Sequence, residues 1–532
     1  MSFVYPTSTK GSLAGSFSHP TGEHVNSHGH LGWFVTGLFV VGDLAGGGLV
    51  ALPTAMIQSG FWGGLVITTI MTLVVTYTAY VLGLSWNILL ERWPEYHSHC
   101  RKPYPEIGYR ALGVHMRRFV SICIDVTQFG ISVVYLLLSS KNIHDFLKAF
   151  FKSDLSFCIV VLCLAVCLLP ITFLKSPNDF WWAVVIAMMT TSIAVILILV
   201  GSVLDYDKCH SEKAMPDFHV TNYFLALGTF LFAYGGHSAF PTIQHDMRRP
   251  QEFTKSVILA FTIMAIMYFP VCIMGYLTYG NSVRDSIINS IQITGIQQAI
   301  NILITIHCIL TLTIVFNPLM QEAEELFRVK QHFGIGRVIV RTSIMIAVVI
   351  VAETIPTFGP LLDLVGGSTL TLTSIVFPCV FYLWLAAGKR KAEVEKGCDD
   401  GPVSFREMVK YTPRATLYTC LFIIVFGLIG GCAATYSAIK ELTSSSVFTT
   451  PCYARGRGFI HADGEDAAHT NCCGHCQNIA TRSGVTCAQP ALDFYHDEAS
   501  KYSVCSAVNM TTQIIGSTLS SALPNLFNGF NY

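Results

Sequence analysis

The chain has 532 residues, of which 52% are hydrophobic and only 12% are charged, and its formal net charge is zero. The charged fraction is about half that of an ordinary soluble domain. This composition argues against a soluble protein and leaves no basic surplus for a nucleic-acid partner, so we expect a protein of the lipid bilayer.

The first segment, residues 1–30, is polar and lacks the apolar core of a cleavable secretory signal. We expect it to be a disordered tail. Eleven apolar stretches follow, each reaching the roughly 20 residues that cross a bilayer as a helix. They lie at 31–57, 61–90, 119–141, 156–174, 180–203, 220–242, 254–280, 292–320, 337–355, 359–387 and 414–437. The pattern predicts an all-α polytopic membrane protein with eleven spans in residues 31–437.

The distribution of positive charge predicts the orientation of these spans. Of the 33 Lys and Arg residues, 22 fall in the first tail and the loops on its side of the bilayer, six in the short opposite loops and five in the last segment. The positive-inside rule therefore places the N-terminus in the cytosol. An odd number of spans places the last segment, residues 438–532, on the extracellular or lumenal side.

The last segment is rich in cysteine. Six of the 18 cysteines lie there: Cys452, Cys472, Cys473, Cys476, Cys487 and Cys505. An even set in an oxidising compartment favours disulfides, and Asn509-Met510-Thr511 is a glycosylation sequon. A rival interpretation makes residues 469–476 a zinc site, but disulfides are favoured and we expect no bound metal.

Other cysteines and histidines have simpler explanations. Cys209, in an opposite loop, is a seventh disulfide candidate, whereas Cys158 and most other cysteines in or beside spans are expected to pack as small apolar residues. Four histidines of the first tail could bind metal, although a mobile polar tail is favoured. They are His19, His24, His28 and His30.

Glycines interrupt the first and sixth spans. The fragment GDLAGGGLVALP (42–53) breaks the first, and LGTFLFAYGGHSAFP (227–241) breaks the sixth. Because the breaks are offset by five spans, an odd number, two five-span units would be inverted relative to each other, as in inverted-repeat transporters. Broken backbone is tolerated in a membrane where its freed groups line a cavity or meet a ligand.

The alternative is that the glycines only allow close helix packing, since Gly42 and Gly46 have GxxxG spacing. Three consecutive glycines point about 100° apart, so at most two can serve one interface. We therefore favour a cavity at the break and expect Gly42→Ala, outside the triplet, to be mild.

Free N–H groups and the positive end of a half-helix favour a carboxylate, and freed carbonyls can hold an ammonium. Such a paired site suits a zwitterion, of which an amino acid is the commonest small example. The substrate-binding candidates are Gly46, Gly47, Gly48, Tyr234, Gly235, Gly236 and His237.

Ionisable residues within spans are costly and are candidates for ion coupling. Asp43 lies at the first break and could bind a proton or sodium, or could instead cap the following half-helix. Asp125 stands beside Gln128 and Tyr135, where a hydrogen-bonded strut is as good an explanation as a relay.

His237 adjoins the second break, where it could titrate or hold the unwound backbone as a neutral ring; His307 is a weaker candidate. Thr311 and Thr313 could supply oxygens to a sodium ion, although threonines commonly bond back to their own helix.

Four motifs in order carry a family resemblance: GDLAGGGLVALPTAMIQSGFWGGL, PYPEIGYRALG, FAYGGHSAFPTIQHDMRRP and IPTFGPLLDLVGGSTLTLTSIVFP. Over about residues 30–437 the chain resembles the amino acid/auxin permease family, which is similar in fold to LeuT-type transporters. The resemblance implies a 5+5 inverted repeat plus one further helix and secondary active transport of amino acids, coupled to protons or sometimes sodium. It does not extend to the cysteine-rich last segment.

A coupled carrier is the preferred function, with a non-transporting amino acid sensor or a channel as the alternative. The sequence contains no HExxH, GxSxG or Walker A motif, so nothing in it suggests an enzyme. We expect a monomer whose partners are an amino acid and the bilayer, with no cofactor beyond the coupling ion, in the plasma membrane or an endolysosomal or vesicular membrane.

Overall fold

A computed structural model describes residues 31–443, apart from 99, 152–154, 174–180, 211–219, 281–282, 284–285, 330–333 and 396–400. The expectations for the first tail, the six cysteines of the last segment, Asn509 and the alternative zinc site fall outside the described residues.

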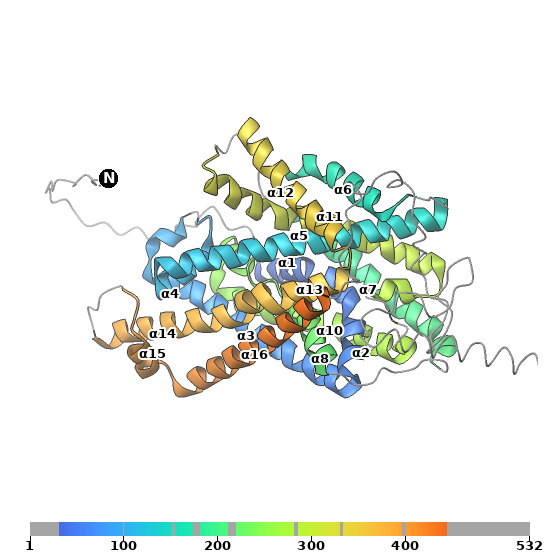
Figure 1. The fold of residues 1–532 in the computed structure, drawn as a ribbon. Coiled ribbons are helices and arrows are strands. Elements are labelled where there is room, and N and C mark those ends of the chain that lie inside the picture. Colours follow the sequence, from blue (N-terminus) through green and yellow to red (C-terminus); the bar gives the residue numbers. More distant parts are fainter. Residues whose placement is uncertain are drawn as a thin grey trace, which may run out of the picture.

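The described residues fold almost entirely into helices (Figure 1). The first half contains α1 (Trp33–Leu44), α2 (Gly47–Ser59), α3 (Phe61–Arg92), η1 (Pro94–His97), α4 (Pro103–Leu112), α5 (Val114–Phe151), α6 (Phe157–Thr172) and α7 (Trp181–Cys209). The second contains α8 (Val220–Ala233), α9 (Phe240–His245), η3 (Pro250–Glu252), α10 (Phe253–Tyr279), η5 (Ile287–Ser290), α11 (Thr294–Leu326), α12 (Ile335–Thr354), α13 (Phe358–Val365), η6 (Gly366–Leu370), η7 (Leu372–Val376), α14 (Phe377–Glu395), α15 (Phe405–Tyr411) and α16 (Arg414–Leu442).

Many of these helices suit a bilayer. Among the described residues, eight helices are long and apolar enough to cross it, or nine when the bent pair α1 and α2 counts as one span. Two shorter apolar helices, α6 and α8, occupy the remaining predicted positions. The predicted all-α polytopic membrane fold is confirmed, and the count of eleven remains a prediction.

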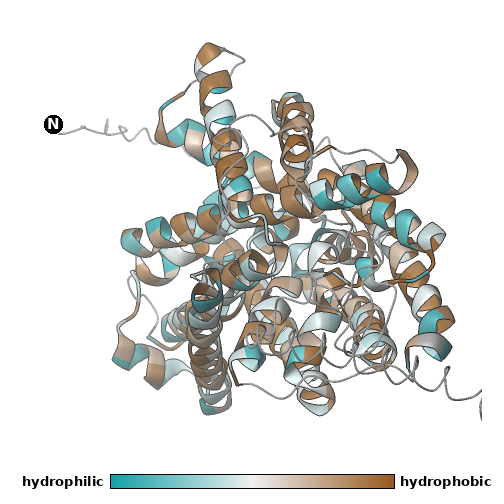
Figure 2. Cartoon of the chain, turned by 45° about the vertical axis from the view of Figure 1, so that its right-hand side comes forward, coloured by the Kyte–Doolittle hydropathy of each residue, from teal (hydrophilic) through white to brown (hydrophobic). Residues whose placement is uncertain are grey.

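Many large apolar side chains lie on the outer surface, as lipid requires. Figure 2 shows hydrophobic stretches, interrupted by hydrophilic ones, along most of the helices. Large side chains such as Trp62, Val166 and Ile266 are 75%, 70% and 68% exposed. Exposed apolar area on this scale is costly in water and favourable against lipid tails.

The two predicted breaks are present and meet in the fold. The α1 and α2 axes differ by 62° across Ala45 and Gly46, while residues 234–239 separate α8 from α9. Helix α2 packs on α8, and α1 packs on α10. A Cβ atom on Gly236 would lie 2.1 Å from Leu44 Cδ2, so the two breaks are in direct contact.

A third departure from regular α-helix lies between α13 and α14. Residues 366–376 form two consecutive π-helical segments, η6 and η7, between α13 and α14. Small residues let α16 approach them: a Cβ on Gly431 would lie 2.7 Å from Thr371 Cγ2. A Cβ on Gly366 would lie 2.0 Å from the Gly228 carbonyl, so α8 also packs closely here.

Among the cysteines that the structure describes, two are disulfide-bonded. They are Cys158, near the start of α6, and Cys209, the last residue of α7. The expectation that Cys158 packs as a free apolar residue is wrong. Consecutive spans run in opposite directions, so the start of α6 and the end of α7 lie at the same side of the bilayer.

Candidate functional site

A cavity of about 690 Å³ lies between the two breaks. One wall comes from α1, through Phe39, Asp43 and Leu44, and the facing wall comes from the second break. The long helices α5 and α11 close the sides. This volume is within the range of about 300–1,000 Å³ that small-molecule sites occupy.

Asp43 is a carboxylate at the contact between the breaks: its Oδ2 lies 3.6 Å from where a Cβ of Gly236 would be. Its partly exposed side chain lines the cavity, and no described residue forms an ion pair or hydrogen bond with it. The capping alternative is excluded, because Asp43 belongs to the last turn of α1 and Gly46 occupies the N-cap of α2 without a side-chain hydrogen bond. Asp43 is therefore a carboxylate facing the cavity.

Gly46 is placed where a side chain cannot fit. A Cβ there would lie 1.9 Å from His307 Nε2. The His307 ring is fully buried and fixed on both sides: Nδ1 lies 2.8 Å from Thr191 Oγ1, and Nε2 lies 3.3 Å from Thr311 Oγ1. Gly46 thus allows α11 to approach the first break closely.

The next two glycines pack against other elements. Gly47 and Gly48 form the first turn of α2 rather than the break, and none of the triplet has positive φ. A Cβ on Gly47 would lie 2.8 Å from a Tyr135 ring carbon, and one on Gly48 would lie 2.6 Å from Ala233 Cα. Each glycine of the triplet serves a different contact, and none lines the cavity.

The second break is the more open of the two. Gly235, Gly236 and Ser238 line the cavity. Among the described residues, no hydrogen-bond acceptor pairs with the N–H groups of residues 236–238. The second break therefore presents free donors beside the cavity, as the sequence predicts for broken spans.

Tyr234 and His237 point away from this cavity. Tyr234 Oη lies 2.8 Å from Thr72 Oγ1. His237 Nε2 lies 3.0 Å from Thr78 Oγ1 and 3.2 Å from the Val75 carbonyl. Both side chains are fully buried and attach the second break to α3, which is the structural alternative considered for His237.

Asp125 also lines the cavity, from α5, together with Gln128 and Tyr135. It lies within electrostatic range of Glu322 and Lys102, nearer the surface than Asp43. No hydrogen bond joins it to Gln128 or Tyr135, so the strut alternative finds no support.

The two threonines of α11 are engaged elsewhere. Thr311 lies against His307, and Thr313 donates to the Ile309 carbonyl of its own helix at 2.9 Å. Neither lines the cavity. Back-bonding to the helix explains Thr313 fully.

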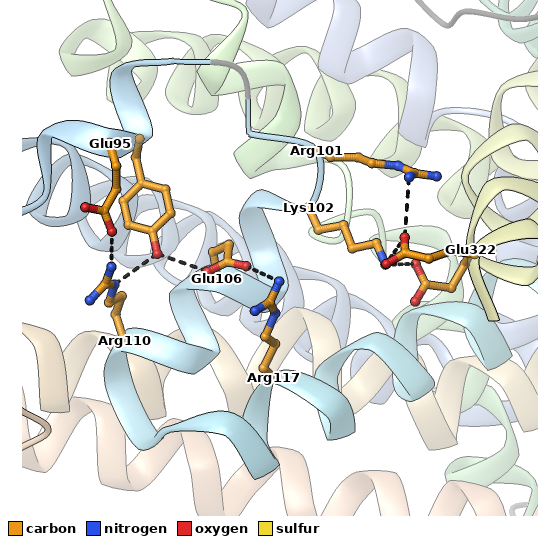
Figure 3. A network of polar contacts seen from close by, with 9 residues as sticks. Glu95, Arg101, Lys102, Glu106, Arg110, Arg117 and Glu322 are labelled. Carbon is orange, nitrogen blue, oxygen red and sulfur yellow. Dashed lines mark hydrogen bonds and ion pairs between the residues drawn. The ribbon is translucent and has the colours of Figure 1, made fainter. Parts of the chain in front are cut away.

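The cavity reaches the surface through a charged mouth that the sequence analysis did not identify. Lys102 Nζ lies 2.5 Å from Glu322 Oε2 and 2.9 Å from Glu325 Oε2, and Arg101 Nη1 lies 3.4 Å from Glu325 (Figure 3). These pairs join the start of α4 to the end of α11. Arg101 and Lys102 directly precede the PYPEIG motif, but their acidic partners lie more than 200 residues away in the sequence.

A second polar group supports α4 from its other side (Figure 3). Tyr96 Oη donates to Glu106 at 2.9 Å and accepts from Arg110 Nε at 2.9 Å. Arg117 pairs with Glu106 at 2.7 Å, and Arg110 pairs with Glu95. Nearby, burial raises the pKa of the Cys100 thiol to about 11, which favours the protonated thiol at neutral pH.

The fold and this site define a multi-pass integral membrane protein with a solute-sized cavity at the crossing of two broken spans. Residues 29–437 match the family described as "Transmembrane amino acid transporter protein". The chain therefore belongs to this family of transporters, and the resemblance seen in the four motifs is confirmed.

Its relatives bear corresponding names. Amino acid transporter AVT1D of Arabidopsis thaliana is 25% identical over 409 residues, covering 75% of this chain and 68% of the relative. AVT1J of the same plant is 26% identical and covers 79% and 93%. Its lysine histidine transporter-like 3 is 26% identical and covers 78% and 91%. A solved structure described as the substrate-bound outward-open state of a Na+-coupled sialic acid symporter gives a TM-score of 0.41 at 12% identity, covering 79% of this chain and 92% of that one.

Proposed function

We propose that the protein is a secondary active transporter that moves amino acids by alternating access around its two broken spans, with protons as the coupling ion. The observation that carries this proposal is that Asp43 and the free N–H groups of the second break face one cavity. Family membership and the names of the relatives support an amino acid as the substrate.

The geometry supports a specific mode of coupling. Asp43 Oδ2 lies 3.6 Å from where a Cβ of Gly236 would be. A substrate carboxylate accepting from the N–H groups of Gly236 and Ser238 would therefore lie next to Asp43. Two adjacent negative carboxylates repel each other in a site with little water. A proton on Asp43 removes that repulsion, so proton and substrate bind together.

The side of the membrane to which the cavity opens supports an assignment of the conformation in the transport cycle. The mouth at Arg101 and Lys102 lies on the side that the positive-inside rule assigns to the cytosol. Disulfide bonding of Cys158 and Cys209 supports an oxidising compartment on the other side. The cavity then opens toward the cytosol, which is the substrate-releasing conformation of an importer.

Reconstitution in liposomes tests the proposal. Purified protein is given a panel of labelled amino acids with an imposed pH gradient, an imposed sodium gradient or neither. We expect accumulation against a concentration gradient only with the pH gradient. Binding without accumulation would instead indicate a sensor, and downhill flux alone a channel.

Two single variants then test the mode of coupling. Asp43→Asn should abolish gradient-driven accumulation while homoexchange persists, because the amide never repels the carboxylate. Asp125→Asn, the matched carboxylate of the same cavity, should keep accumulation. If Asp43→Asn instead raises the KM of exchange more than tenfold, Asp43 binds the substrate ammonium and coupling lies elsewhere.

A further inference from the structure

A second, much smaller void lies away from the central cavity. Its volume is about 20 Å³, and its polar lining consists of Thr54, Gln58, Thr229, Asp363 and Glu441. These residues come from α2, α8, α13 and α16, so four helices meet there. The small void and the charged mouth of the central cavity lie at opposite ends of the first span. Helix α1 begins at the mouth, and Gln58 lies at the far end of α2.

The side chains that line the void are buried, and its volume limits what it can hold. Gln58, Thr229, Asp363 and Glu441 are only 6%, 5%, 3% and 6% exposed. A space of roughly 10–15 Å³ on this scale is enough for one water-sized particle. The void therefore accommodates a single small particle and no hydration shell.

The lining is rich in oxygen acceptors. Thr229 donates to Asp363 Oδ1, which fixes that carboxylate against α8. Gln58 Oε1 is buried and accepts no hydrogen bond from any described residue. A buried polar atom without a partner is costly, and coordination of a bound ion would satisfy it.

The surrounding backbone holds these oxygens in place. A Cβ on Gly228 would lie 2.7 Å from the Asp363 carbonyl, so the α8 and α13 backbones are in contact. The π-helical segment η6 follows directly after α13, and π-helical turns are frequent at functional sites.

We infer that this void is a cation site, and that Na+ bound by Asp363, Glu441, Gln58 and the two threonine hydroxyls joins α2 and α8 to α13 and α16. All of these ligand atoms are oxygens, and oxygen ligands favour hard cations. Mg²⁺ keeps several of its waters, and the void has no room for them. The two carboxylates make a cation a better occupant than a neutral water. The bound ion stabilises the closed end of the bundle while the central cavity is open at the mouth.

Thermal unfolding of the purified full-length protein in detergent tests this inference independently of transport. At constant ionic strength, replacing choline chloride with NaCl should raise Tm saturably by about 2 °C or more, because a ligand that binds only the folded state stabilises it. KCl and CaCl₂ serve as further arms. Equal Tm values in NaCl and choline chloride would overturn the inference, and stabilisation by calcium alone would overturn the sodium assignment.

Three variants locate the ion. Gln58→Leu preserves volume but removes the unpartnered oxygen, so it should fold and lose at least half of the sodium-dependent shift. Asp363→Asn should lose the shift completely. Asp205→Asn is the matched control, since Asp205 is a buried carboxylate on α7 that accepts from Tyr279 at 2.7 Å, and it should keep the shift. A full shift in Gln58→Leu, or its loss in Asp205→Asn, would place the sodium elsewhere.

Discussion

The two broken spans look alike in sequence but use their glycines differently. At the first break, Gly46 to Gly48 are each covered by a different element, and only residues on the α1 side reach the cavity. At the second break, Gly235 and Gly236 line the cavity. Glycine allows close packing in one case and access to the backbone in the other, so a glycine-rich break does not by itself identify a binding surface.

The largest effect should come from adding a side chain at Gly46 in the first break. Gly46→Ala places a Cβ 1.9 Å from His307 Nε2, and the ring is held by two threonines. We expect about 3 kcal/mol or more of destabilisation, at the upper end of overpacking costs, seen as loss of a monodisperse gel-filtration peak and a lowered Tm.

Two controls accompany this variant. Gly46→Ala with His307→Ala should recover part of the folded yield, since the second change removes the obstructing ring. Gly63→Ala, whose Cβ would meet nothing closer than 3.7 Å, should be neutral or stabilising. An unchanged Tm for Gly46→Ala alone would show that the first break is not closely packed.

Gly236→Ala, which adds a side chain in the second break, should damage transport more than folding. A Cβ on Gly236 meets the flexible end of Leu44, at 2.1 Å from Cδ2. The Leu44 side chain can move into the cavity, so we expect a near-normal Tm but an uptake kcat/KM reduced by about tenfold, equivalent to about 1.4 kcal/mol. Normal uptake by Gly236→Ala would remove the second break from the proposed site.

An intermediate effect is expected at Gly42, where the structure overturns the expectation of a mild substitution. A Cβ there would lie 2.8 Å from both the carbonyl oxygen and Cγ1 of Val184 on α7. Backbone atoms move less readily than side-chain ends, so Gly42→Ala should cost about 1–3 kcal/mol. Chemical or thermal unfolding measures this cost, and a Tm equal to that of the wild type would restore the milder view.

The smallest effect should come from the mouth. Lys102 pairs with Glu322 and Glu325, but the three side chains are 21%, 27% and 53% exposed. Partly exposed ion pairs contribute about 0–1 kcal/mol and are screened by salt. Lys102→Ala should therefore change Tm little, and the change should shrink at high salt. A large, salt-independent loss would mean that the mouth contributes substantially to holding the bundle together.

The sequence by itself determined the membrane class, the approximate positions of most helices and the two breaks. Hydrophobicity and glycine interruption are local properties, so a window of about 20 residues is enough to detect them. The four motifs also indicated the family. Asp43 was recognisable as a candidate because a carboxylate within an apolar span is costly wherever the helix faces.

Only the tertiary structure decided which side of each break is open. That outcome depends on contacts between residues far apart in the chain, such as Gly46 with His307 and Gly236 with Leu44. The charged mouth required the same information, because Lys102 meets Glu322 only when α4 packs near the end of α11. Helix rotation and crossing are set by the packing of distant side chains, and no local pattern specifies which face of a helix meets a cavity.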